Sequence, residues 1–371
     1  MTATAPSNRE IIAALLGELK THLPDWYGDD ATLDEAQVSL HLYPYSFFLH
    51  IPIRVQGKTV TLLAKIKRQP DTEEIAAAIN IERFRKAAQA EFEMTQKIYI
   101  TLEKQDCVGC SAVRALAYLP QWNAVVMEKV EGKALKSYLL SKQILLRSSA
   151  ARQEIDDYLA ASARWLRVFH RDISQMQLRP FPLEAARQDV EDSLESLEKY
   201  SRGKAKVALY RAAFQRAFAS LADESLPYGI VHDDFHYSNL LIDAQSRVCV
   251  IDNAGDYRHC AYVDLATLIT DPQTRTKQII SQGLFIPAKF IGGWRNTFLK
   301  NYFGESPYSK KALNFFSALA VLNKWSEGLG RLSLQYHGKI PSLILQWVDA
   351  YFSVLLSDYL SEFDIAPASA G

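Results

Sequence analysis

The stretch that decides the fold runs from Ile230 to Ala266 and reads IVHDDFHYSNLLIDAQSRVCVIDNAGDYRHCAYVDLA. An apolar run leads into a loop that carries His232, Asp234 and Asn239. The segments LLID and VCVID follow and predict a β-hairpin, with Asp252 at the end of its second strand. A hairpin returns the chain, so we expect the Asn239 and Asp252 ends to lie close together. Two oxygen ligands beside a free carboxylate are typical of phosphoryl transfer, in which Mg²⁺ takes few protein ligands and a separate Asp orients the attacking hydroxyl.

Several short motifs follow one another in a fixed order along the chain. The loop matches the pattern H-G-D-x-H-x-x-N at His232, Asp234, His236 and Asn239. An I-D strand end at 251–252 and a D-L-A at 264–266 follow it. In these motifs the chain resembles the family of aminoglycoside phosphotransferases and choline kinases, small-molecule kinases with a protein-kinase-like fold. Upstream, AVVMEKVEG at 124–132 looks like the strand, hinge and turn that hold adenine, and WLRVFH at 165–170 resembles the helix before the catalytic loop.

The resemblance implies where the reacting groups are bound. Asp234 would be the catalytic residue, and Asn239 and Asp252 would hold Mg²⁺. The nucleotide would be ATP or GTP, and the acceptor would be a hydroxyl of a small molecule such as an aminoglycoside, a choline-like amino alcohol or a sugar. The hinge residues expected to hold the base are Met127, Glu128 and Val130.

A kinase of this type also needs a strand lysine that reaches the nucleotide phosphates and a helix glutamate that holds the lysine. Lys65 and Lys67 share one strand face, but Lys65 lies between apolar neighbours and Lys67 at the polar strand end, which favours Lys65. On the following helix, Glu91 has apolar neighbours three, four and seven residues away, whereas Glu93 has polar ones. We therefore predict a Lys65–Glu91 pair, with Glu93 facing solvent.

The chain departs from the family pattern at three places. No Gly-rich loop stands between the first two predicted strands, where PYSF at 44–47 occupies the turn. Phosphate binding there would rely on the Ser46 hydroxyl and amide. Asp233 replaces the glycine of the loop motif, and Asn253 follows Asp252 where the family usually has an aromatic residue. Nucleotide affinity is the property that these changes put in question.

The pattern of elements predicts an α+β, two-lobed, protein-kinase-like fold. An amphipathic helix at 7–25 with Ser7 as N-cap precedes a three-stranded antiparallel meander, a long helical stretch and two more strands. The predicted bounds are 38–43, 47–55 and 59–67 for the meander, 73–104 for the helical stretch, and 115–118 and 124–130 for the last two strands. We predict a nucleotide-binding lobe at 1–130 and a helical lobe at 131–371. The helical lobe would contain the catalytic loop at 230–256 and the acceptor-binding helices at 270–365.

Composition excludes several other classes. The chain has 371 residues, 48% of them apolar, and Lys plus Arg equal Asp plus Glu at 42 each, so no net charge favours nucleic acid as a partner. Neither a signal sequence nor a membrane-spanning apolar run is apparent, so we expect neither secretion nor membrane insertion. Four cysteines do not make a disulfide framework, and we expect a reduced, cytoplasmic compartment.

Some residues have a structural alternative. We expect His232 and His236 to brace the loop rather than transfer protons, because phosphoryl transfer depends above all on positioning. Asp264 is predicted to brace the same loop from a buried position. The CVGC at 107–110 has metal or redox spacing, but no second C-x-x-C completes a metal site.

Two other functions remain open at this point. The missing Gly-rich loop would suit a nucleotide-binding pseudokinase that acts as a scaffold. A protein Ser/Thr kinase is the other alternative, disfavoured because the segment after Asn253 runs quickly into Asp264 and has no A-P-E ending.

Overall fold

The computed structural model describes residues 6–142, 148–200, 204–253 and 255–363. The chain divides into two compact units, of which the first comprises Met1–Lys133 with Leu241–Asp256 and the second Ala134–Leu240 with Tyr257–Gly371. The loop predicted at 230–256 is therefore divided after Leu240, because the hairpin that follows pairs with strands of the first unit. A sheet-containing unit and a mainly helical unit confirm the predicted α+β, two-lobed fold.

The first unit is built on a six-stranded sheet of order β1-β3-β4-β7-β6, with β2 paired to β3 beside β1. Its strands are β1 (Thr32–Leu33), β2 (Ser39–Tyr43), β3 (Ser46–Val55), β4 (Lys58–Lys67), β6 (Ala115–Leu119) and β7 (Ala124–Glu128). All pairings in it are antiparallel, and β2, β3 and β4 form the predicted meander. The two-residue strand β1 was not predicted.

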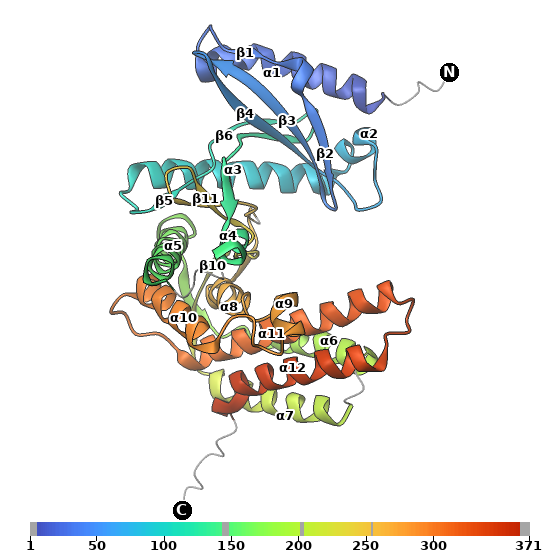
Figure 1. The fold of residues 1–371 in the computed structure, drawn as a ribbon, viewed down its shortest axis with the longest axis vertical. Helices are drawn as coiled ribbons and strands as arrows, with labels where there is room; N and C mark the ends of the chain where they lie inside the picture. Colours follow the sequence, from blue (N-terminus) through green and yellow to red (C-terminus); the bar gives the residue numbers. More distant parts are fainter. Residues whose placement is uncertain (1–5, 143–147, 201–203, 254, 364–371) are drawn as a thin grey trace, which may run out of the picture. The chain divides into compact units, whose positions relative to one another are not determined.

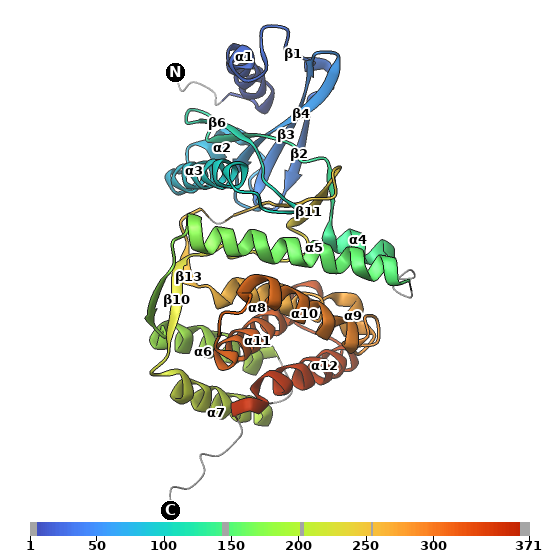
Figure 2. The same cartoon turned by 90° about the vertical axis from the view of Figure 1, so that its left-hand side faces the viewer.

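Helices pack on both faces of this sheet (Figures 1 and 2). Helix α1 (Asn8–Tyr27) begins at Ser7, whose side chain and Glu10 form a capping box, as the sequence predicted for Ser7. Its Leu15 and Leu19 are fully buried against alternate residues of β3 and β4. Helix α3 (Glu82–Lys104) lies on the opposite face.

The stretch predicted as one helix at 73–104 is two helices. Helix α2 (Ile75–Ile79) ends at Asn80, whose side-chain amide donates to the Ala76 carbonyl at 2.9 Å. Ile81 has extended backbone angles, and α3 begins after it. An Asn that satisfies a helix-terminal carbonyl is a common way to end a helix.

A second, small sheet has the order β5-β12-β11-β8. Its strands are β5 (Cys110–Ser111), β12 (Val248–Val250), β11 (Leu240–Asp243) and β8 (Gly132–Ala134). Cys110, the first residue of β5, forms a disulfide with Cys107, which the sequence analysis did not predict. Cys249 and Cys260 are buried and free, so this short-range bridge is no disulfide framework.

The second unit packs its helices around α11 (Lys310–Gln335), which contacts α6, α8 and α12 (Figure 2). The other helices are α4 (Leu135–Lys142), α5 (Ser149–Val168), α6 (Leu183–Tyr200), α7 (Lys204–Leu221), α8 (Tyr262–Thr270), α9 (Thr276–Ile280), α10 (Ala288–Phe303) and α12 (Ser342–Leu360). A sheet of order β13 (Arg258–Cys260), β10 (Ser225–Ile230), β9 (Gln177–Pro180) completes the unit. Phe315, Phe316 and Trp325 of α11 are buried and form part of the core of this unit. No helix among the described residues has the length and apolar character needed to cross a bilayer.

Candidate active site

In the first unit, one buried lysine joins two carboxylates. Lys65 Nζ on β4 donates to Glu91 Oε1 on α3 and to Asp252 Oδ1, both at 2.7 Å. The side chains of Lys65 and Glu91 are 9% and 4% exposed, whereas that of Asp252 is 46% exposed. Burial alone would lower the pKa of Lys65, but the two carboxylates outweigh it and raise the pKa above its usual value. Three residues chosen from the sequence thus form one charged cluster.

Glu91 has a second cationic partner. Lys67 Nζ lies 2.8 Å from Glu91 Oε2, and the Lys67 side chain is 27% exposed. The predicted Lys65–Glu91 pair is present, and Lys67 reaches the same glutamate because alternate residues of one strand share a face. Glu93 is exposed and bonds to Gln89 at 2.8 Å, which confirms the predicted phase of α3.

Strand register explains which residues share this face. Lys65 is directly paired with Phe48 and Lys67 with Ser46 across β3 and β4. Directly opposed residues in an antiparallel pair point to the same side of the sheet. Ser46, the candidate phosphate contact, therefore lies on the face that carries both lysines, and it is buried. The Lys65 ammonium also lies 5.8 Å from the centre of the Phe48 ring.

The turn that replaces a Gly-rich loop is held by an arginine that sequence reasoning missed. The turn at Pro44 and Tyr45 joins β2 to β3, and the Arg68 backbone amide donates to the Tyr45 carbonyl at 2.9 Å. The Arg68 side chain contacts the Pro44 carbonyl at 3.4 Å and lies over the Phe47 ring. Arg68 is 8% exposed, so this is a braced turn and not an open loop.

The chain around Asp252 is fixed against α3. Asp252 has a left-handed backbone with φ of 59°, a conformation that costs free energy for a residue other than glycine. The next residue, Asn253, donates to the Thr95 hydroxyl at 2.9 Å. At Gly255 an added Cβ would lie 3.2 Å from the Glu91 backbone nitrogen. Asn253, noted in the sequence as a departure, therefore ties the Asp252 segment to the helix that carries Glu91.

The hinge residues lie at the end of β7. Met127 and Glu128 belong to the strand, and Val130 follows it. The Glu128 side chain accepts hydrogen bonds from Tyr27 at 2.6 Å and from Arg114 at 2.8 Å, so its carboxylate is engaged within the first unit. Its backbone amide donates to the Arg114 carbonyl at 3.0 Å.

In the second unit, Asp264 on α8 supports the loop that carries Asp234. Asp264 is fully buried and accepts from the backbone amides of His232 at 2.8 Å and Asp233 at 2.9 Å. His170 Nε2 lies 2.9 Å from the same carboxylate, in a π-helical turn (Phe169–Ile173) after α5. These contacts confirm that Asp264 braces the loop. They also hold Asp233 at φ of 71°, where the family motif has glycine.

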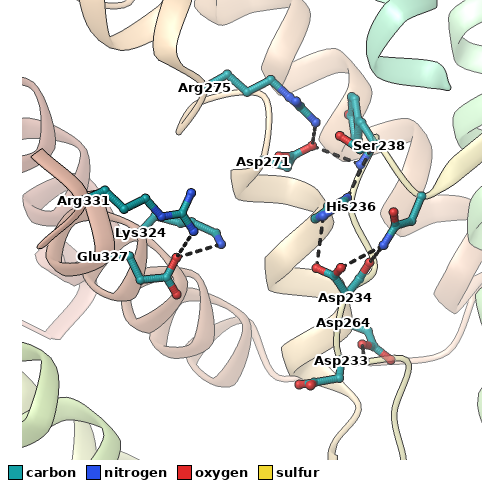
Figure 3. A network of polar contacts seen from close by, with 12 residues as sticks. Asp233, Asp234, His236, Ser238, Asp264, Asp271, Arg275, Lys324, Glu327 and Arg331 are labelled. Atoms are coloured by element: carbon teal, nitrogen blue, oxygen red, sulfur yellow. Dashed lines mark hydrogen bonds and ion pairs between the residues drawn. The ribbon is translucent and has the colours of Figure 1, made fainter. Parts of the chain in front are cut away.

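Asp234 itself is held at both carboxylate oxygens (Figure 3). His236 Nε2 lies 3.1 Å from Oδ1, and Asn239 Nδ2 donates to Oδ2 at 2.9 Å and to the Asp234 carbonyl at 3.0 Å. The Ser238 amide donates to His236 Nδ1 at 3.2 Å, so the neutral ring carries its proton on Nε2, facing Asp234. His236 is thereby a brace for Asp234, as predicted.

These contacts shift the pKa values of both Asp234 and His236. The hydrogen bond from His236 lowers the pKa of Asp234 below its usual value, against the opposing effect of burial. Burial alone would lower the pKa of His236, but the hydrogen bond to Asp234 and its charge outweigh it and raise that pKa. Asp234 is therefore a carboxylate at neutral pH, although its side chain is 58% exposed.

Two cavities of the second unit meet at this loop. One, of about 330 Å³, and another, of about 610 Å³, are both lined by Asp234, His236, Asp271, Thr274 and Lys324. Figure 3 shows Lys324 and Glu327 on α11 facing the Asp234–His236 pair. A fixed carboxylate at the wall of a partly open cavity is placed to meet a small bound molecule.

The donor chemistry of the two candidate metal ligands fits Mg²⁺. Both contacts of the Asn239 amide nitrogen go to Asp234, which leaves Oδ1 of Asn239 as the atom oriented to accept a metal. Asp252 offers a half-exposed carboxylate in the first unit. Within the ranges that the structure describes, no group of three His, Cys, Asp or Glu side chains could hold a metal by itself. Each of the two residues, taken by itself, thus offers an oxygen of the type that Mg²⁺ takes alongside water and phosphate.

Comparisons with solved structures identify proteins with a similar fold. A glucosamine kinase in complex with glucosamine, ADP and inorganic phosphate is 14% identical with a TM-score of 0.56, over 90% of this chain and 83% of that chain. A Ralstonia eutropha protein assigned to the aminoglycoside phosphotransferases is 14% identical with a TM-score of 0.55, over 96% of this chain and 99% of that chain. At this identity the likeness shows a shared fold. No curated protein matches the chain.

The sequence comparison goes further than the fold. The profile of the phosphotransferase enzyme family matches residues 62–282, which is more than half of the chain and spans both Lys65 and the Asp234 loop. This match confirms the resemblance on which the expected enzymatic class was based. The chain belongs to the phosphotransferase enzyme family.

Proposed function

We propose that this protein transfers the γ-phosphoryl group of ATP, or of GTP, to a hydroxyl group of a small molecule. The observation that carries the proposal is the Asp234 carboxylate, held at both oxygens by His236 and Asn239 and placed where two cavities meet. A carboxylate with a lowered pKa stays ionised and accepts the hydrogen bond of an attacking hydroxyl.

The other candidate residues have positioning roles in this proposal. Lys65, held by Glu91, would contact the nucleotide phosphates, and Asn239 with Asp252 would hold Mg²⁺. When bound, Mg²⁺ offsets the negative charge of the phosphates. The residues proposed to complete the nucleotide site are Ser46 at the phosphates and Met127, Glu128 and Val130 at the base. Because the Glu128 carboxylate is already engaged, contacts to the base would come from backbone groups.

The acceptor belongs to the class of small alcohols. Aminoglycosides, amino alcohols and sugars all offer a hydroxyl, and the cavities at Asp234 have volumes of about 330 and 610 Å³. The similar glucosamine kinase holds an amino sugar together with ADP, which keeps sugars among the first candidates.

One observation favours a second candidate, a nucleotide-binding scaffold without turnover. The braced turn at Pro44 and Tyr45, held by Arg68, occupies the place of a Gly-rich loop and offers fewer backbone amides to phosphate. Nucleotide binding without transfer to any acceptor would favour this candidate.

Two experiments test the proposal in sequence. ATP with Mg²⁺ should raise the melting temperature of the protein through ligand linkage, and no shift at millimolar nucleotide would exclude both candidates. A panel of metabolites and aminoglycosides incubated with isotopically labelled ATP, and read by mass spectrometry, should then yield one labelled phosphomonoester. Labelling of added proteins and of no metabolite would instead indicate a protein kinase.

A further inference from the structure

The larger of the two cavities at Asp234 has a cationic wall. Its volume is about 610 Å³, and Leu139, Ile286 and Trp294 supply apolar surface. Five cationic side chains line it: Lys136 of α4, Arg275 and Lys277 at the start of α9, and Lys324 and Arg331 of α11. The carboxylates on the same wall are Asp234 and Asp271. Segments far apart in the sequence thus contribute positive charge to one space.

The carboxylates near this wall are already engaged. Asp271 accepts from the Tyr237 amide at 3.0 Å and forms an ion pair with Arg275. Glu327, which lines the smaller cavity, lies 3.3 Å from Lys324 Nζ and 3.5 Å from Arg331, so one carboxylate serves two cations (Figure 3). Even with Glu327 included, the cations of this wall outnumber the carboxylates. The excess positive charge points to an anionic ligand group.

The smaller cavity has the opposite character. It is lined by five carboxylates, Asp189, Asp233, Asp234, Asp271 and Glu327, and by one lysine, Lys324. Burial, followed by the nearby charges of Asp264 and Asp234, raises the pKa of Asp233, as expected where negative charge is crowded. An anionic group would be repelled from this side and attracted to the other. The two cavities that share Asp234 therefore differ in the sign of their predominant charge, which is positive in the larger one and negative in the smaller one.

We propose that the cavity lined by Lys136, Arg275, Lys277, Lys324 and Arg331 binds an anionic group, a phosphate or a carboxylate, carried by the acceptor alcohol. The proposal rests on the proposed function, because it names the class of acceptor for the same site. Arginine and lysine side chains bind such groups through charge-assisted hydrogen bonds. Anchoring the anion on this wall would leave a hydroxyl of the same molecule within reach of Asp234.

A matched panel of sugars tests this proposal without requiring turnover. The four sugars share a hexose frame and differ in charge. Glucose 6-phosphate carries two negative charges, glucuronate carries one, glucose is neutral and glucosamine carries a positive charge. Isothermal titration calorimetry without nucleotide should rank the first two above glucose and glucosamine, with affinity falling as salt is added. Inorganic phosphate is titrated as a separate probe, to distinguish a free-ion site from an acceptor site.

Variants assign the binding to the cationic wall. The double variant Lys277→Gln/Arg331→Gln should weaken binding of the anionic sugars at least tenfold. Lys311→Gln, an exposed lysine of α11 outside the cavity, should leave it unchanged. If the double variant does not fold, as judged by its melting curve, Lys136→Gln on α4 should give the same direction of change.

Several outcomes would overturn the proposal. The proposal is wrong if glucosamine binds as tightly as glucose 6-phosphate, or if inorganic phosphate binds and neither anionic sugar does. It is also wrong if the double variant binds the anionic sugars as well as the unaltered protein, or if ADP displaces glucose 6-phosphate. The last would assign the cationic wall to the nucleotide phosphates. Failure of the proposed function has a different signature, since anionic sugars would still bind while no labelled phosphomonoester forms from any acceptor.

Discussion

The two groups of candidate active-site residues are held in opposite ways. In the first unit, Lys65 and Glu91 are buried and fixed by charge, with Lys67 as a further cation. In the second unit, Asp234 is more than half exposed and is fixed by hydrogen bonds from His236 and Asn239. A buried charge cluster contributes to folding as well as to ligand positioning, whereas an exposed carboxylate contributes to chemistry with little effect on stability. Substitutions in the two groups should therefore separate stability from turnover.

The largest effect is expected at the exposed carboxylate and on turnover alone. Asp234→Asn should lower the rate of phosphoryl transfer to an identified acceptor by about 10²-fold or more, because the amide is a poor acceptor for the hydroxyl proton. Its melting temperature and its nucleotide affinity should stay near those of the unaltered protein. Initial rates, thermal melting and ATP titration measure the three quantities.

Asp223→Asn is the control for this substitution, since Asp223 is an exposed carboxylate of the same unit outside both cavities. It should change none of the three quantities. Near-normal turnover in the Asp234 variant would show that another group orients the acceptor.

The next largest effect is expected at the buried cluster and on stability. Glu91→Gln removes the charge that serves both Lys65 and Lys67, and breaking a buried ion pair costs about 3 kcal/mol of unfolding free energy. Glu93→Gln, two residues along the same helix and exposed, should cost less than about 0.5 kcal/mol. Urea unfolding measures both values. Equal losses at the two positions would contradict the assignment of Glu91 to the cluster.

Within the cluster, the two lysines should differ in degree. Lys65→Met keeps most of the side-chain stem but leaves two carboxylates without this cation, and it should lower the free energy of unfolding by about 2 kcal/mol. Lys67→Met should lower it by about 1 kcal/mol, because Lys67 is more exposed and has one carboxylate partner among its described ion pairs. The same pair of variants, measured by ATP titration, should show the larger loss of affinity at Lys65. A larger loss at Lys67 in both measurements would move the phosphate contact to that residue.

The lysine pair also shows what local sequence pattern can and cannot predict. The alternation of β4 and the helical phase of α3 placed Lys65 and Glu91 inward, because both periodicities are local properties. That Lys67 reaches the same glutamate depends on the position at which α3 crosses the strand, which no local pattern contains. The brace that Arg68 gives to the 44–45 turn depends likewise on a contact across the hairpin.

In the second unit, too, the sequence predicted some residues of the candidate site and missed others. The motif spacing identified Asp234, Asn239 and the buried brace Asp264 within one short stretch. The cationic wall was not foreseen, since Lys136 and Arg331 are nearly two hundred residues apart and become neighbours of one cavity only through the packing of α4 and α11. Charge patterning along a chain carries no information on such tertiary convergence.

The smallest effect is a pH dependence that belongs to the exposed group alone. The folded-state pKa of His236 lies above the ordinary value of 6.5, so its protonation stabilises the folded state fully below about pH 6.5, and this stabilisation is lost as the pH rises through the raised pKa. The pKa of Asp234 is lowered, so its own contribution is present above 3.8 and is lost only as the pH falls through the lowered value. Between pH 6 and 9, therefore, His236 is the member of this pair that titrates.

The variant His236→Gln keeps an amide donor near Asp234 but cannot titrate. The unaltered protein should therefore melt at a higher temperature than this variant at pH 6, and the difference in melting temperature should shrink as the pH rises to 9. The change should be a few degrees at most, because Asp234 is solvent-screened. His337→Gln, at an exposed position between α11 and α12, should melt in parallel with the unaltered protein throughout. If His236→Gln also runs parallel, the His236–Asp234 contact has no electrostatic role, and hydrogen bonding from Asn239 is what holds the carboxylate.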